Sequence, residues 1–106
     1  MISQATIENL LEQAKQELQI DFDDDDLKIT SIIKNGCNEL IRICGVCESD
    51  FEAGNRANAL LLAFVRRAYD GDLSNFRNDY KSEIMTLKTE SEVKRYEESS
   101  AQTESV

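Results

Sequence analysis

The chain has 106 residues, of which 41% are apolar, so it can bury one small core but not two. It carries 12 basic and 21 acidic side chains, and this net charge of −9 argues against a protein that coats DNA by neutralising phosphates. Histidine is absent, which excludes Ser-His and Cys-His nucleophiles, imidazole acid–base chemistry and histidine-bearing zinc sites. Proline is also absent, so most of the chain is free to be helical.

The N-terminus lacks the basic and apolar stretches of a signal peptide. The longest apolar run, residues 59–65, is far shorter than the ~20 residues that a membrane span needs. We therefore expect a soluble protein that is cytosolic at synthesis, has no membrane partner and keeps its cysteines reduced.

A first helix is predicted over residues 4–18, because Ile7, Leu10, Leu11, Ala14 and Leu18 fall on one helical face. Ser3 or Thr6 could cap this helix. The acidic link that follows, residues 21–26, holds five carboxylates in six residues and cannot pack in a core. It is predicted to be exposed, and its last members can favour the start of the next helix.

A long second helix is predicted over residues 26–44, with a broad apolar face and Gly45 as a left-handed C-terminal cap. Residues 46–54 are predicted to form a loop. The third helix, residues 55–69, is apolar over so wide a face that we expect it to be the most buried.

A fourth helix is predicted over residues 73–87, where the apolar residues keep helical spacing. After Lys88 the apolar content collapses, so residues 1–88 form the predicted domain and residues 89–106 a flexible polar tail. This tail is predicted to be disordered when alone, although the helix could extend to Glu98. The fold class is all-α, a small four-helix domain.

Two motifs suggest metal or redox chemistry, and both are weak. Asp21-x-Asp23-x-Asp25 resembles the start of a calcium loop, but the glycine and the bidentate glutamate of that motif are missing. Cys44 and Cys47 form a C-x-x-C after a helix rather than at its N-terminus, and only Cys37 could add a third thiolate for zinc. Buried free thiols at Cys37 and Cys44 are the expected outcome, with no metal and no cofactor.

The remaining candidates also favour ordinary structural roles. Arg56, Arg66 and Arg67 could touch phosphate, but a charged outer face on a buried helix is commoner. Tyr69 and the Phe76–Tyr80 pair are more typical of a core than of a ligand platform. No catalytic residue is assigned, and we expect a protein that presents surfaces rather than an enzyme.

Three stretches carry a resemblance to a known family. They are a short first helix from residue 6 followed by the acidic turn, a long helix over residues 29–44, and the string 56–84. In that string, an apolar helix and a break with Gly71 precede Phe76 and Tyr80, four residues apart, and a final short helix. This layout resembles the ring-forming head–tail connector proteins of tailed phages, also called adaptor or head-completion proteins.

The resemblance implies a structural virion protein of the neck. Its members form a ring, typically of twelve copies, beneath the portal protein, where the ring completes the DNA-filled head and extends the DNA channel. The ring also offers a docking face to the stopper or tail-completion protein. The implied location is the virion neck, between capsid and tail, and the host cytoplasm before assembly.

Two sets of residues follow as candidate sites. The resemblance suggests that the C-terminal segment orders on the portal, with Val93, Arg95 and Tyr96 as the anchors. The acidic surface formed by Asp23, Asp24, Asp25 and Asp26 could line the channel, where like charge would let packaged DNA pass without sequence-specific binding.

Two other readings remain open. A small acidic interaction or regulatory protein, including a nucleic-acid mimic, would explain the acidic link, although residues 27–69 carry a net charge of +2. A small enzyme is the weakest reading, because the sequence has neither a metal set nor a phosphate loop.

Overall fold

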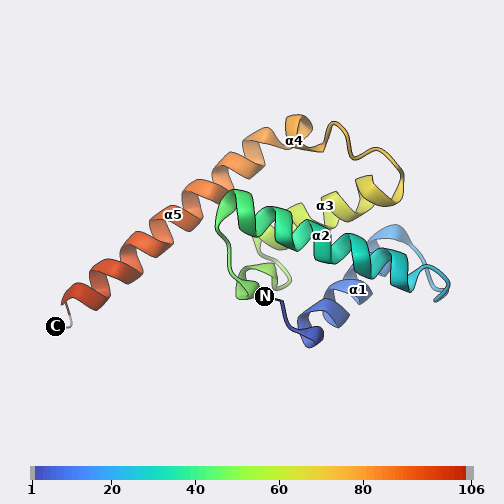
Figure 1. Ribbon diagram of the computed structural model, residues 1–106, viewed down its shortest axis with the longest axis horizontal. Helices are drawn as coiled ribbons and strands as arrows, with labels where there is room; N and C mark the ends of the chain where they lie inside the picture. The colour runs from blue at the N-terminus through green and yellow to red at the C-terminus, as the bar shows by residue number, and fades with distance from the viewer. Residues whose placement is uncertain (1, 105–106) are drawn as a thin grey trace.

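The computed structural model describes the backbone of residues 2–104 and the side chains of residues 2–97. In chain order the elements are α1 (Gln4–Leu18), α2 (Asp26–Cys44), the 3-10 helix η1 (Glu48–Phe51), α3 (Arg56–Tyr69), α4 (Phe76–Asp79) and α5 (Lys81–Glu104). Among these described residues no strand occurs, and the all-α prediction is confirmed. The first three helices pack together, while α5 begins against them and then projects away (Figure 1).

The helices α1, α2 and α3 match the sequence prediction to within one residue at each end, and a predicted cap marks two of those ends. The Ser3 hydroxyl accepts a hydrogen bond from the backbone N–H of Thr6, at 3.3 Å, and caps α1. Gly45 ends α2 in the left-handed conformation, with φ 72°, and its N–H donates to the carbonyl of Ile41. Both caps were predicted from the residue types alone.

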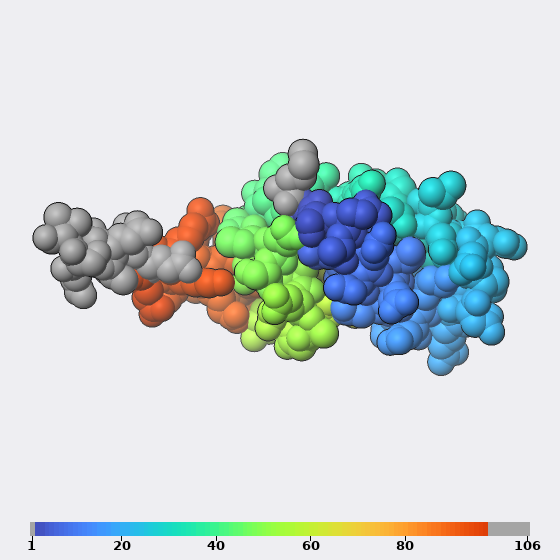
Figure 2. All heavy atoms as spheres, turned by 90° about the horizontal axis from the view of Figure 1, so that it is seen from below, coloured from blue at the N-terminus to red at the C-terminus, as the bar shows by residue number. Residues whose placement is uncertain are grey.

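The core lies between α1, α2 and α3, and the first turns of α5 close one end of it. The molecule is elongated, with principal extents of 53 × 30 × 20 Å, and this shape is plain in Figure 2. The most completely buried large side chains are Phe51, Leu10, Ile29, Ile33, Leu40, Leu61, Val65, Cys37 and Cys44.

The prediction of one fourth helix over residues 73–87 is wrong. Leu73 precedes α4 and is 37% exposed, and the chain breaks between α4 and α5 at Tyr80. Contacts from α3 hold this break, because the Arg67 guanidinium lies 2.7 Å from a carboxylate oxygen of Asp79 and over the Tyr80 ring. Phe76 nevertheless packs in the core, as its spacing predicted.

The backbone of residues 89–104 is helical, so the helical extension that the sequence allowed as far as Glu98 continues to Glu104. Contact between this segment and the core ends at Ser91. Ser91 is buried, whereas residues 92–97 are exposed. Helical propensity and a few polar side-chain contacts therefore support the helix beyond Ser91, and isolated helices of such length are marginal in water. That the segment orders on a partner stays a prediction.

Asn58 is a buried polar residue on α3 that joins three elements. Its amide N–H₂ donates to Gln13 of α1, at 2.7 Å, and to the carbonyl of Phe51 in η1, at 2.9 Å. We expect Asn58→Ala to lower the free energy of unfolding by about 1–3 kcal/mol, because the Phe51 carbonyl is left buried without its donor. Urea denaturation measures this loss. Asn9→Ala, at an exposed position of α1, is the control and should change little.

Candidate interaction surfaces

The acidic link between α1 and α2 is exposed, but it is partly neutralised from within the chain. Lys15 of α1 places its Nζ 2.7 Å from Asp23 and 2.9 Å from Asp26. The hydrogen bond from Lys15 lowers the pKa of Asp23 below its usual value. The hydroxyl of Tyr69 donates to Asp25 at 2.6 Å, and this contact raises the pKa of Tyr69.

The rest of the link is open to solvent. Asp21 and Asp24 are exposed, and neither has an ion-pair partner in the described part of the chain. Two large apolar side chains accompany them: Phe22 is 47% exposed and Leu27, in the first turn of α2, is 88% exposed. The acidic link is therefore an apolar surface as well as a charged one, which the carboxylate count alone did not indicate.

The three residues predicted as portal anchors lie on the projecting part of α5. Val93 is 51% exposed and Tyr96 is 74% exposed. Arg95 is exposed too, but its guanidinium lies over Gly45, so closely that a Cβ at Gly45 would clash with it. This places its positive charge at the negative C-terminal end of α2. Val93 and Tyr96 are thus free for a partner, whereas Arg95 already contacts the domain.

The structure does not bring the two predicted sites together. The acidic link lies where α1 meets α2, at one end of the molecule, and the outer half of α5 lies at the opposite end (Figure 1). Between them are two grooves that the sequence analysis did not predict, because each is lined from elements far apart in the chain.

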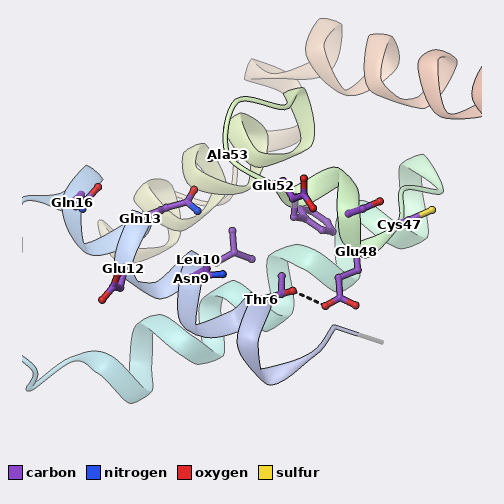
Figure 3. Close-up of a pocket in the computed structure, with 12 residues that line it drawn as sticks. Thr6, Asn9, Leu10, Glu12, Gln13, Gln16, Cys47, Glu48, Glu52 and Ala53 are labelled. Carbon is purple, nitrogen blue, oxygen red and sulfur yellow. Dashed lines mark hydrogen bonds between the residues drawn. The ribbon is translucent and has the colours of Figure 1, made fainter.

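The first groove runs between α1 and η1 and has a volume of about 790 Å³. Figure 3 shows its mixed lining: amides and carboxylates of α1 on one wall, and Glu48 and Glu52 on the other. Figure 2 shows the start of α1 beside the segment around η1. The lining is polar and apolar in nearly equal parts, and it holds no cationic side chain among the residues described.

Glu48 ties the start of α1 to η1 at the rim of this groove. Its carboxylate accepts from the Ser3 hydroxyl at 2.5 Å, from the Thr6 hydroxyl at 2.6 Å and from the Ser3 backbone N–H at 2.9 Å. These three donors, led by the Ser3 hydroxyl, lower the pKa of Glu48 from 4.5 to about 2. The ionised carboxylate therefore holds Ser3 and the first turn of α1 against η1 at neutral pH.

The depressed pKa makes this tether dependent on pH. Its stabilisation is fully present above pH 4.5 and is lost as the pH falls from 4.5 towards 2, where the folded protein is also protonated. We expect Glu48→Gln to lower the melting temperature at pH 7, and the difference from wild type to shrink between pH 4.5 and pH 2. Calorimetric melting curves would show this. Glu52→Gln, exposed in the same groove, is the control.

The second groove, which we call the α2–α5 groove, lies between the C-terminal half of α2, α4 and the start of α5. It consists of two adjoining hollows, of about 500 and 380 Å³, that share Ile43, Arg77 and Ile84. Phe76, Leu73 and Met85 add further apolar lining. Its exposed floor is mainly apolar, unlike that of the α1–η1 groove.

Cationic side chains border the α2–α5 groove. Arg42, Arg77 and Lys81 line it, against the single carboxylate of Glu39. Arg77 forms a short hydrogen bond to Glu39, and with Arg42 it lowers the pKa of that carboxyl. Lys81 is exposed and has no ion-pair partner in the described part of the chain.

The prediction of buried free thiols is confirmed for Cys37 and Cys44. Burial raises the pKa of Cys37 to about 12 and also raises that of Cys44, so both remain neutral and poorly nucleophilic near pH 7. The Cys44 thiol points inward and donates a weak hydrogen bond to the carbonyl of Ile84. Cys47 is exposed, so the two members of the C-x-x-C face different environments.

The three arginines of α3 form ion pairs on the molecule's surface. Arg56 lies 2.8 Å from Glu90, Arg66 lies 3.3 Å from Glu17, and Arg67 pairs with Asp79.

Residues 2–97 contain no cluster of three potential metal ligands. No helix of the described chain is both long and apolar enough to cross a bilayer.

No protein-family model, curated protein or solved structure matches the chain.

Proposed function

We propose that the protein is a structural subunit that assembles with copies of itself into a ring of the phage neck. The ring, of about twelve copies by the family resemblance, would join the portal to the stopper or tail-completion protein and complete the DNA-filled head. The observation that supports this proposal is the helix layout. The short α1, the acidic turn, the long α2 and the apolar α3 before Phe76 follow the order that suggested the family.

The exposed apolar residues at both ends of the molecule agree with this proposal. Leu27 and Tyr96 are 88% and 74% exposed, and they lie at opposite ends of the domain. A subunit with neighbours on more than one side would cover such residues. The role is structural, and the chain supplies surfaces rather than catalytic groups.

The test is sedimentation of the protein with DNA-filled, tailless heads of its own phage. We expect co-sedimentation at about one ring per head, even if the free protein is a monomer. A stable monomer or dimer that does not co-sediment with heads would contradict the proposal. It would favour the alternative, a small acidic interaction protein that binds a soluble partner through Asp21 and Asp24.

The portal contact is tested on the same heads. We expect the double variant Val93→Ser/Tyr96→Ser to lose most of its attachment, because it removes the two free apolar side chains of the projecting helix without touching the core. Truncation after Lys88 should abolish attachment. Glu97→Gln, on the same exposed stretch, is the control. If the double variant attaches as well as the wild type, Val93 and Tyr96 are not part of the contact with the portal.

The channel role of the acidic surface is a separate hypothesis. Reversing all of Asp23 to Asp26 would break the pairs with Lys15 and Tyr69, so the sharper variant is Asp21→Lys/Asp24→Lys. If these carboxylates face DNA, the double variant should retain DNA more tightly and eject it more slowly. Unchanged ejection would discard the channel role.

A further inference from the structure

We propose that the acidic link of one copy docks in the α2–α5 groove of the next copy, as the repeating contact of the ring. This inference rests on the proposed ring function and names the surfaces that would build it. The occupant is a second copy of this chain, because the link and the groove are complementary in both charge and polarity.

The charges of the two surfaces are opposite. Residues 21–26 carry five carboxylates, of which Asp21 and Asp24 face solvent. The groove offers Arg42, Arg77 and Lys81 against one carboxylate, and Lys81 has no ion-pair partner within the described chain. Asp24 and Lys81 are thus exposed, opposite charges that the fold itself leaves uncompensated.

The apolar parts also correspond. The link carries Phe22 and Leu27, exposed at 47% and 88%, and the groove has an apolar floor that includes Met85, exposed at 55%. Apolar side chains that enter a groove bordered by opposite charge give the apolar centre and polar rim typical of protein interfaces.

The two surfaces cannot meet within one molecule. Leu27 lies in the first turn of α2, and Ile43, which lines the groove, lies sixteen residues later on the same helix. At 1.5 Å per residue, the two positions are about 24 Å apart. Figure 1 shows the acidic link and the start of α5 at opposite ends of α2. A contact between unlike surfaces on different copies is heterologous, and repeating it produces a closed ring or an open filament.

The test uses cross-linking between engineered cysteines in the full-length chain. Leu27→Cys and Met85→Cys are introduced together in a Cys47→Ser background, where the two remaining native thiols are buried. A short bismaleimide cannot join the two cysteines within one chain, because residue 27 lies about 24 Å along α2 from Ile43, which lines the same hollow as Met85. We expect a ladder of covalent dimers, trimers and higher species, both in concentrated solution and on heads. A mixture of the two single-cysteine chains should stop at dimers, because each contributes only one reactive surface.

A charge exchange tests the complementarity. Asp24→Lys and Lys81→Asp alter exposed side chains, so the fold should be preserved. We expect each variant alone to reduce the ladder several-fold and the two together to restore it. If the exchange fails to restore the ladder, Asp24 of one copy does not face Lys81 of the next. The proposed placement of the acidic link in the groove is then wrong.

Other outcomes separate this inference from the ring function itself. Cross-linked dimers formed by the Leu27→Cys chain alone would show that the acidic links of two copies contact each other. This would overturn the heterologous contact. Rings that bind heads without any cross-link between residues 27 and 85 would overturn the proposed interface but leave the connector function standing. A ladder formed by a protein that never associates with heads would support the proposed interface and overturn the connector function.

Discussion

Phe51→Ala is expected to lower the free energy of unfolding by about 3–5 kcal/mol, a large part of the ~5–15 kcal/mol typical of a whole domain. Phe51 is 1% exposed, although it belongs to a 3-10 helix of only four residues. Its ring fills the core beneath the α1–η1 groove, and its carbonyl accepts the Asn58 hydrogen bond. Truncation would leave a cavity and loosen the contact of η1 with α3.

Urea denaturation followed by circular dichroism measures this loss. Phe22→Ala is the matched control, because the same substitution is made at a side chain that is 47% exposed. It should change the free energy of unfolding of the monomer by much less. Equal losses for the two variants would show that η1 does not anchor the loop in solution.

The second large effect is expected at Gly36, where α2 packs directly against side chains of α3. A Cβ built there would lie 2.7 Å from Leu61 Cδ1 and 2.8 Å from Phe64 Cδ1, which is closer than carbon atoms tolerate. Leu61 is fully buried and Phe64 is 8% exposed, so neither can move aside without disturbing the core.

Gly36→Ala should therefore destabilise the protein by about 1–3 kcal/mol, even though alanine favours helices by roughly 1 kcal/mol over glycine. Ser31→Ala, at an exposed position of α2, separates the two effects, because it changes helical propensity without a clash. The denaturant midpoints of both variants, compared with that of the wild type, measure the clash apart from the change in helical propensity. A stabilised Gly36→Ala protein would mean that the two helices can move apart at low cost.

The contrast between Gly36 and Phe51 shows how far the sequence predicts this fold. The ends of α1, α2 and α3 could be predicted because Ser3, Gly45 and the apolar periodicity are local signals. The helical spacing of α2 also placed Gly36 on the buried face. Phe51 lies between Asp50 and Glu52 in a segment predicted to be a loop, so no periodicity indicated its burial.

The break at Tyr80 and the α2–α5 groove could not be predicted for a related reason. Phe76, Tyr80 and Ile84 keep helical spacing, and no glycine or proline marks the break. Its partner Arg67 comes from α3. The groove likewise needs side chains from α2, α3, α4 and α5, so its cations and apolar floor become one surface only when the chain is folded.

The unequal burial of the three cysteines gives the protein a built-in reporter. In the folded chain Cys47 alone is exposed, at the edge of the α1–η1 groove, while the thiols of Cys37 and Cys44 are enclosed by the core. A maleimide dye should therefore attach once to the native protein and three times to the unfolded one. Counting labels by mass spectrometry would follow unfolding, and a dye at Cys47 would sense occupants of the groove without any engineered residue.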